Sequence, residues 1–234
     1  MAVLYLIPVT LGECNVASVL PSALPEILRQ TEHYIVENLR NARRFLKRCG
    51  AVSDLDRLTF FELNEHTDAG ELSTFIEPLR HGFTMGLLSD AGCPGVADPG
   101  ADIVRLAHKE RFRVIPLVGP SSILLAMMAS GMNGQNFAFN GYLPVKSDAR
   151  TAKIKLMERR IYAESQSQAF IETPYRNLQL FDALLHTCQP QTRLCVAANL
   201  TLESEFICAM TVAEWRKAPI PDIGKQPAVF VLGT

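Results

Sequence analysis

The stretch TMGLLSDAGCPGVADPG (84–100) decides the fold. Its first six residues are mostly apolar and predict a buried strand over 84–89, and a helix is predicted to follow over 100–109. The segment between them is rich in glycine and proline, which mark a loop. A strand, a glycine-rich loop and a helix in succession are typical of a parallel α/β sheet whose loops bind ligands at the strand ends.

The same alternation of strand and helix runs outward from this stretch. Further strands are predicted at 2–9, 33–37, 59–63 and 113–117, and further helices at 38–49, 68–80 and 121–130. In the helix at 68–80, Asp68 is expected to act as the N-cap. The repeated order predicts a mainly parallel sheet for the first half of the chain.

A polar segment, GYLPVKSDAR (141–150), predicts a domain boundary near residue 142. The expected domains are therefore 1–141 and 142–234, with 136–140 as the last strand of the first. In the second domain, helices are predicted at 149–163, at 176–187 and near Trp215. Strands are predicted there at 168–171, 192–198, 205–210 and 228–232.

Composition excludes several classes of protein. Of 234 residues, 48% are hydrophobic, which excludes a disordered chain. No apolar run reaches the roughly 18 residues of a membrane span, so no membrane association is expected. The start, MAVLYLIPVT, lacks a basic segment and is expected to be a core strand rather than a signal peptide. A net charge of −1 argues against a surface that is basic throughout.

The six cysteines are dispersed, with no C-x-x-C pair and no histidine at zinc-finger spacing. We therefore expect no metal site. Dispersed cysteines in a chain with its own core indicate reduced thiols and a cytoplasmic location.

The loop at 89–100 is the first candidate site. Asp90 and Asp98 could accept hydrogen bonds from ribose hydroxyls or face a cation, and the glycines allow a ligand to approach the backbone. An ordinary tight connection that opens the next helix is the alternative. Two nucleotide motifs fail here: Ala101 and Asp102 replace the Lys and Ser/Thr of a P-loop, and no G-x-G-x-x-G follows the first strand.

Three other groups have a functional and a structural interpretation. Ser121 and Ser122 open a helix and could bind polar ligand groups or simply cap it. The basic helix NLRNARRFLKR (38–48) could contact RNA phosphates or present a solvated face. Glu65 and His66 could act in acid–base chemistry or belong to a solvated loop.

Five segments in this order resemble a known family. They are LYLIPVTLGE (4–13), SDAGCPGVADPG (89–100), VIPLVGPSS (114–122), FNGYLP (139–144) and AFIETPYR (169–176). The chain resembles the tetrapyrrole methylase superfamily, the class III S-adenosylmethionine-dependent methyltransferases. Within it, the chain is most similar to the small-subunit rRNA cytidine 2′-O-methyltransferases.

The resemblance implies a two-domain α/β fold with a mainly parallel N-terminal sheet and a mixed C-terminal sheet. S-adenosylmethionine is then expected in the interdomain cleft, and the chain is expected to be a homodimer. The activity implied is methylation of a ribose 2′-oxygen in small-subunit ribosomal RNA. On the functional interpretation of the basic helix, Arg40, Arg43 and Arg44 are then expected at the substrate. By position, the residues implied at the cofactor are Thr10, Leu11, Gly12, Asp90, Ala91, Gly92, Cys93, Val96, Ser121, Ser122, Glu172, Thr173, Leu200, Pro227 and Ala228.

The chain departs from this family at several positions. Thr10 replaces a proline, Asn38-Leu39 an Asp-Thr pair, Asn64 a histidine and Ala198-Asn199 an Arg-Glu pair. These losses leave the cofactor interpretation intact and keep two alternatives open. One is a methyltransferase for a small molecule such as a tetrapyrrole, and the other a cofactor-binding homologue without catalysis. No general base is assigned, although Glu65, His66 and Asp98 are candidates.

Overall fold

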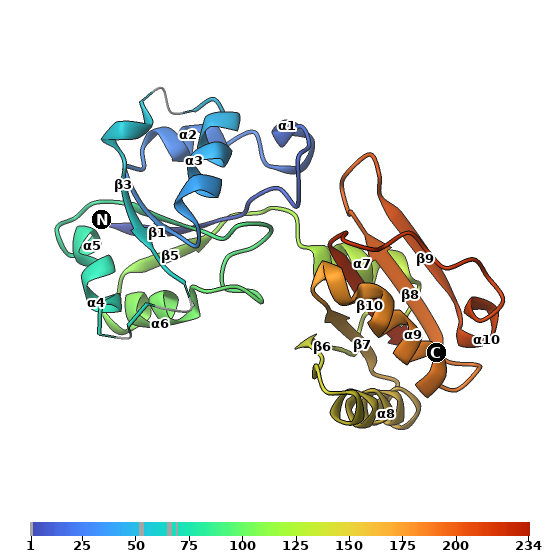
Figure 1. The fold of residues 1–234 in the computed structure, drawn as a ribbon. Helices are drawn as coiled ribbons and strands as arrows, with labels where there is room; N and C mark the ends of the chain where they lie inside the picture. The colour runs from blue at the N-terminus through green and yellow to red at the C-terminus, as the bar shows by residue number, and fades with distance from the viewer. Residues whose placement is uncertain (1, 52–53, 65–66, 69) are drawn as a thin grey trace. The chain divides into compact units, whose positions relative to one another are not determined.

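The computed structural model describes residues 2–51, 54–64, 67–68 and 70–234 (Figure 1). The chain forms two compact units, Met1–Ser121 and Ser122–Thr234. Each unit is built on its own five-stranded sheet with helices packed against it, so the predicted α/β class is confirmed.

The first sheet is parallel throughout, as the sequence predicts. Its strands are β1 (Val3–Ile7), β2 (His33–Val36), β3 (Thr59–Glu62), β4 (Met85–Leu88) and β5 (Arg113–Pro116), in the order β3-β2-β4-β1-β5. Every residue of the inner strand β4 is buried, as expected for a strand covered on both faces. At Gly86 a Cβ atom would lie 2.7 Å from Ile7 Cδ1, so only glycine fits there. Because all the pairs are parallel, the carboxyl ends of the five strands meet at one edge.

Helices cover both faces of this sheet. They are α1 (Val16–Val19), α2 (Leu24–Arg29), α3 (Leu39–Arg48), α4 (Leu72–Phe75), α5 (Glu77–Arg80) and α6 (Ala101–Lys109), with a short turn η1 (Leu55–Arg57) before β3. One apolar cluster joins α2 and α3 to the sheet, and a second joins α4, α5 and α6 to its other face. Figure 1 shows the two groups of helices on opposite sides of the strands.

The prediction of one helix over 68–80 is wrong. The chain forms two short helices, α4 and α5, which meet at Ile76. Pro78 lies in the first turn of α5; it has no N–H to donate and its ring disfavours helical backbone before it.

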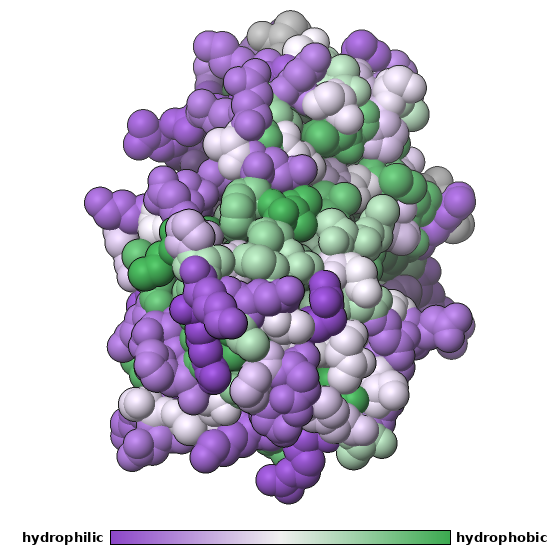
Figure 2. Space-filling view, turned by 90° about the vertical axis from the view of Figure 1, so that its right-hand side faces the viewer, coloured by the Kyte–Doolittle hydropathy of each residue, from purple (hydrophilic) through white to green (hydrophobic). Residues whose placement is uncertain are grey.

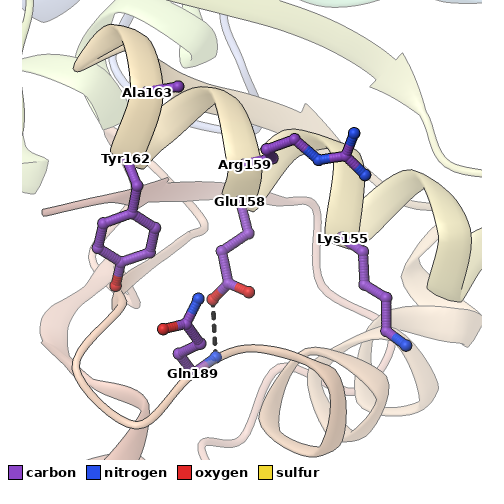
Figure 3. A pocket seen from close by; sticks show the side chains of 6 residues that line it. All are labelled: Lys155, Glu158, Arg159, Tyr162, Ala163 and Gln189. Carbon is purple, nitrogen blue, oxygen red and sulfur yellow. Dashed lines mark hydrogen bonds between the residues drawn. The ribbon is translucent and has the colours of Figure 1, made fainter.

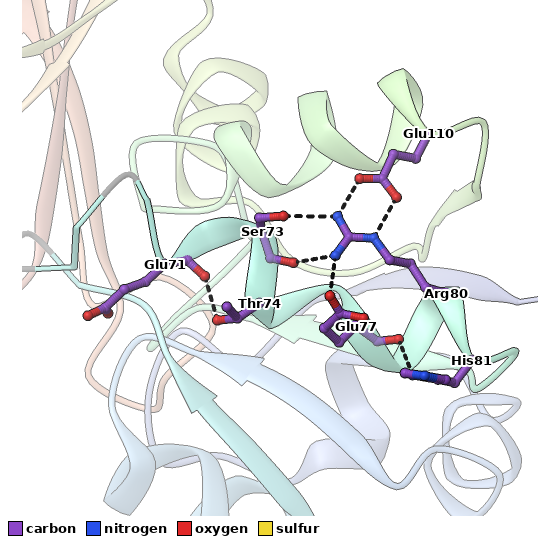
Figure 4. Close-up of polar contacts among 7 residues, drawn as sticks. All are labelled: Glu71, Ser73, Thr74, Glu77, Arg80, His81 and Glu110. Atoms are coloured by element: carbon purple, nitrogen blue, oxygen red, sulfur yellow. Dashed lines mark hydrogen bonds and ion pairs between the residues drawn. The ribbon is translucent and has the colours of Figure 1, made fainter.

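Arg80 fixes these short helices to the end of α6 (Figure 4). Its guanidinium donates to the Glu110 carboxylate at 2.9 and 2.5 Å, to Glu77 Oε1 at 2.6 Å, and to the backbone oxygen and hydroxyl of Ser73. This planar, multidentate pairing holds three elements around one side chain. It positions α6, which begins directly after the glycine-rich loop.

The second sheet is mixed, as the resemblance implies. Its strands are β6 (Phe137–Tyr142), β7 (Ser167–Ile171), β8 (Arg193–Ala198), β9 (Phe206–Thr211) and β10 (Ala228–Gly233), in the order β6-β7-β10-β8-β9. Only the β6–β7 pair is parallel among the strands described. The central strand β10 is buried along its whole length.

Its helices are α7 (Ser122–Ser130), α8 (Ser147–Glu164), α9 (Asn177–Thr187) and α10 (Val212–Trp215), with a short turn η2 (Pro174–Arg176) before α9. The main apolar cluster joins α8, α9 and α10 to one face of the sheet, where Phe181 and Trp215 meet edge to face at 5.2 Å. Helix α7 packs against β7, β8, β9 and β10 without joining this cluster, and Figure 1 shows it on the other side of the strands.

The compact units divide between Ser121 and Ser122, whereas the sequence pattern places the boundary between 141 and 142. The strand expected to end the first domain is β6, which pairs with β7 instead. Helix α7 also packs on the second sheet. Local pattern identified both elements correctly, but their partners are distant in sequence and no local signal names them.

Among the residues with described positions, no helix is long and apolar enough to cross a membrane.

Candidate functional site

Three loops are tied together at the carboxyl edge of the first sheet. They follow β1, β4 and β5. Val9 and Gly92 exchange two backbone hydrogen bonds, of 2.8 and 3.0 Å, which join the first loop to the second. The Cys93 thiol donates to the Pro120 carbonyl oxygen at 3.5 Å, which joins the second to the third. The sheet thus brings together the predicted residues Thr10, Leu11, Gly12, Asp90, Ala91, Gly92, Cys93 and Ser121.

The second loop needs its glycines. Gly92 and Gly100 have φ of +73° and +130°, in a region that favours glycine. A Cβ on Gly100 would also lie 2.9 Å from Leu87 Cδ2. Ala97, at φ 65°, holds a backbone conformation that is costly for an L-residue. Strained backbone of this kind is common in loops that hold ligands.

A hollow of about 200 Å³ lies beside the first two loops. Residues 9–13 and Asp90 and Ala91 line one side, and α3 contributes Asn41, Arg44, Phe45 and Arg48. The Asn41 amide donates to Asp90 Oδ2 at 2.7 Å, which ties the basic helix to the glycine-rich loop. The sequence did not predict Asn41, because only the strand order shows that α3 and this loop share an edge.

Three carboxyl groups gather at this edge: Glu37, Asp90 and Asp98. The Asp90 N–H donates to Glu37 Oε2 at 3.3 Å. Burial raises the pKa of Asp98 to about 6; the charges of Glu37 and Asp90 add to the shift, and a hydrogen bond from Ser89 opposes it. Burial also raises the pKa of Glu37. Of the three candidate general bases, Asp98 is the one whose position the structure describes, and its pKa suits a group that accepts a proton near neutral pH. Glu65 and His66 lie outside the described residues.

Glu37 was not predicted as part of the site. It follows β2, which pairs directly with β4, so its carboxylate lies beside the second loop. The strand order is the signal that identifies it.

The raised pKa of Asp98 predicts a pH-dependent stability. The folded pKa lies above the unfolded value of 3.8, so the folded state holds the Asp98 proton more tightly than the unfolded state does. The free energy of unfolding therefore falls as pH rises from about 4 to 6 and Asp98 becomes charged. Replacing Asp98 with asparagine removes this cost. The D98N variant should match the wild type in urea unfolding at pH 4 and exceed it by about 1 kcal/mol at pH 8, after allowing for solvent screening. A difference that is equal at both pH values would contradict this assignment.

The three arginines expected at the substrate differ in their surroundings. Arg40 and Arg44 are exposed on α3. Arg43 is engaged within the protein: it pairs with Asp56 Oδ1 at 2.6 Å, donates to the Leu55 carbonyl oxygen, and lies 6.0 Å from the Phe60 ring centroid. Arg43 therefore anchors the turn η1 to α3, whereas Arg40 and Arg44 are exposed, and Arg44 forms a long ion pair, of 4.0 Å, with the exposed Glu13.

The predicted residues of the second unit meet at one edge of its sheet. Strands β7 and β8 end there and β10 begins there, with Ala228 opposite Ala198. The Asn199 N–H donates to the Pro227 carbonyl oxygen at 3.0 Å. The sheet thereby brings together Glu172, Thr173, Leu200, Pro227 and Ala228.

Buried polar atoms without a protein partner gather at this second edge. The Glu172 side chain is fully buried, and its Oε1 accepts from Arg176 at 2.6 and 3.0 Å and from the Thr173 N–H at 2.7 Å. Within the described part of the chain, Glu172 Oε2 and Thr201 Oγ1 are buried with no hydrogen-bond partner. Buried polar atoms are nearly always hydrogen-bonded, so these atoms fit the donors and acceptors of a ligand.

Thr201 is a third residue that the sequence did not predict. It has φ of +70° and follows Asn199, at +50°. Its neighbour Leu200 was predicted and is buried. The signal is the strained backbone at the end of β8, which is visible only in the structure.

The other predicted residues lie in less enclosed positions. Val96 is 49% exposed in the second loop, and Ser122 begins α7 in the second unit.

No three His, Cys, Asp or Glu side chains with described positions gather in an arrangement that suits a metal ion. All six cysteines are free thiols, and burial raises the pKa of Cys49 to about 11 and that of Cys188 and Cys195 to about 12.

Two curated relatives match most of this chain. Ribosomal RNA small subunit methyltransferase I of Vibrio cholerae is 31% identical over 212 residues, which is 91% of this chain and 69% of that protein. The protein of the same name from Escherichia coli O157:H7 is 30% identical over 211 residues, which is 90% of this chain and 70% of that protein. No family model matches the chain.

Solved structures share the fold at low sequence identity. The methyltransferase CobJ is 14% identical, with a TM-score of 0.66 over 100% of this chain and 95% of that one. The uroporphyrin-III-C-methyltransferase from Thermus thermophilus is 16% identical, with a TM-score of 0.56 over 99% of this chain and 92% of that one. These two likenesses concern the fold alone.

Proposed function

The chain belongs to the family of ribosomal RNA small subunit methyltransferase I, and on that premise we propose that it methylates a ribose 2′-oxygen of small-subunit ribosomal RNA. Membership makes the chain a methyltransferase. The methyl donor that we propose is S-adenosylmethionine. The observation that carries the proposal is the set of three joined loops beside the basic helix α3.

Each unit by itself offers groups of the kind that such a donor needs. The loops at Thr10–Gly12 and Asp90–Cys93 offer backbone N–H and C=O groups at close approach. Glu172 Oε2 is a buried acceptor suited to an ammonium or hydroxyl group, and the apolar Leu200 and Ala228 lie beside it. The donor, when bound, supplies an already activated methyl group, so the protein mainly orients the reactants and excludes water.

A ribose hydroxyl must lose its proton when its oxygen is methylated. Asp98 is the group we propose to accept it, since its pKa lies near the pH at which an efficient general base works. The neighbouring Glu37 and Asp90 oppose a further negative charge and so favour proton uptake.

The cations of α3 support RNA as the acceptor. Arg44 and Arg48 line the hollow beside the first loop, and Arg40 and the internally paired Arg43 line a second, more open one. Such cations suit the phosphates of an RNA chain.

Incubation with labelled S-adenosylmethionine tests the proposal. The acceptor is small-subunit ribosomal RNA, free or in assembled subunits, from a strain that lacks this gene. We expect label in the RNA, at a nucleotide that then resists alkaline cleavage because its 2′-oxygen is blocked. Tight cofactor binding by calorimetry without labelled RNA would contradict the RNA acceptor and favour a small molecule.

Removing two α3 cations should weaken RNA binding. The variant with Arg40→Gln and Arg44→Gln should lose on the order of tenfold in affinity for the same RNA, and the dependence of affinity on salt should become shallower. The single variant R43Q is the matched control, because Arg43 is paired with Asp56. R43Q should lower thermal stability and change RNA affinity little. Equal losses of affinity in both variants would contradict this division of roles.

We further propose that the chain is a homodimer in the cytoplasm. Helix α7 exposes Leu124 and Met128, at 53% and 78%, one turn apart on one side. Exposed apolar side chains such as these suit an interface, and Figure 2, coloured by hydropathy, shows further hydrophobic residues at the surface among hydrophilic ones. Light scattering should give a mass of about twice 25.9 kDa.

A ribosomal RNA acceptor and six free thiols support the cytoplasmic location.

A further inference from the structure

One side of α8 carries cations that the proposed site does not use. Lys155 and Arg159 are exposed. Neither of them forms an ion pair with another described residue. Lys155 and Arg159 are one helical turn apart, about 6 Å along the axis. They form a positive surface on the second unit that has no internal partner.

This surface borders a shallow hollow of about 540 Å³, shown in Figure 3. Its lining includes Lys155, Glu158, Arg159, Tyr162 and Gln189. The one carboxylate among them is turned inward: Glu158 Oε1 accepts from the Gln189 N–H at 2.7 Å and from the Thr192 hydroxyl at 2.5 Å. In Figure 3 Lys155 and Arg159 extend on one side of Glu158 and Tyr162 lies on the other. The outer rim of the hollow is therefore cationic.

Tyr162 adds an exposed aromatic ring to this rim. The side chain is 42% exposed, and its hydroxyl lies 2.8 Å from Thr192 Oγ1. This hydrogen bond fixes the ring at its far end, so the ring is held in place before any ligand binds. A fixed ring beside two cations suits a nucleobase whose phosphates meet those cations.

The hollow lies at the sheet edge opposite to Glu172. Helix α8 leads into the start of β7, and Gln189 precedes the start of β8, whereas Glu172 and Leu200 follow the ends of these strands. Six residues of β8 separate the two edges by about 20 Å. A ligand bound at the Glu172 edge is too small to reach this hollow, but an RNA chain is long enough.

We propose that Lys155, Arg159 and Tyr162 form a second contact for the substrate RNA, with the cations on its phosphates and the ring stacked on an unpaired base. This inference rests on the proposed function. The surface anchors RNA at a point away from the methylated nucleotide, so it contributes to RNA affinity and leaves the chemical step unchanged.

Two variants of the full chain test the inference: K155Q/R159Q and Y162A, with unmodified small-subunit rRNA transcript and assembled subunits as probes. K155Q/R159Q should bind the transcript on the order of tenfold more weakly, with the salt slope reduced by about 1.5. Y162A should weaken binding about fivefold or more, and Y162F, which keeps the ring but loses its hydrogen bond to Thr192, should weaken it less than Y162A does. In methyl-transfer assays KM for RNA should rise while kcat stays constant. Calorimetry with S-adenosylmethionine should show unchanged affinity.

The matched control removes two exposed lysines elsewhere, K109Q/K217Q. If this control weakens RNA binding as much as K155Q/R159Q does, the loss of affinity follows from the overall charge of the protein and not from this surface, and the inference fails. If K155Q/R159Q binds transcript like the wild type but loses affinity for assembled subunits, the surface recognises a ribosomal protein and the inference also fails. A wild-type protein that binds cofactor but no RNA would overturn the proposed function itself, whereas RNA methylation unaffected by both variants would overturn this inference alone.

Discussion

Replacing Glu172 with glutamine is expected to lower the affinity for S-adenosylmethionine about 100-fold. The fully buried carboxylate already satisfies Arg176 and the Thr173 N–H through Oε1, which leaves Oε2 to accept a hydrogen bond from the bound donor. A charge-assisted hydrogen bond in a buried site is worth more than a neutral one, and glutamine removes the charge. Arg176 also loses its ionic partner, so stability should fall by about 2 kcal/mol. Calorimetry measures the affinity and urea unfolding the stability.

Glu158→Gln is the matched control for this variant. Glu158 is a second buried glutamate of the same unit, but its carboxylate faces Gln189 and Thr192 at the opposite sheet edge. E158Q should lower stability and leave cofactor affinity unchanged. If E172Q bound the cofactor as tightly as E158Q, Glu172 would have no role in the proposed site.

Replacing Gly92 with valine is expected to lower cofactor affinity at least about tenfold. Gly92 has φ of +73°, and a Cβ there would lie 3.4 Å from Leu11 Cδ2 and 3.7 Å from the Pro120 carbonyl oxygen. The branched side chain would therefore force apart the loops that Gly92 joins through its two bonds to Val9. The left-handed backbone also costs about 2 kcal/mol for a branched residue.

Gly50→Val separates strain from crowding. Gly50 follows α3 at φ of +62°, and nothing lies within 4 Å of an added Cβ. G50V should lose a similar amount of stability in urea unfolding and bind the cofactor like the wild type. Equal affinities for G92V and G50V would show that the junction of the three loops is not part of the cofactor site.

The strands of the first unit follow from local pattern, and their parallel pairing follows from the alternation with helices. β4 is apolar throughout because helices cover both its faces, and this pattern is visible in the sequence. Helix α6 begins where Gly100 predicts it. The helix at 68–80 shows the limit of periodicity, because Pro78 divides it although the apolar spacing continues through it.

The candidate site was predicted only in part. The glycine-rich loop came from its residue pattern and Glu172 from the family resemblance, and the structure adds Asn41, Glu37 and Thr201. Arg43 shows the reverse. In the sequence it belongs to the same run of cations as Arg40 and Arg44, but in the structure its guanidinium forms an ion pair with Asp56. An ion pair between residues 13 positions apart leaves no periodic trace in the sequence.

The sequence by itself determined the class of most elements, though not the short helices α1 and α2, and the turns that need glycine, because burial on two faces and positive φ restrict residue type locally. Only the tertiary structure decided which sheet receives β6 and α7, and which polar atoms remain without partners at the strand ends. These outcomes depend on pairing between distant segments. Such pairing is set by the packing free energy of the whole unit rather than by any single stretch of chain.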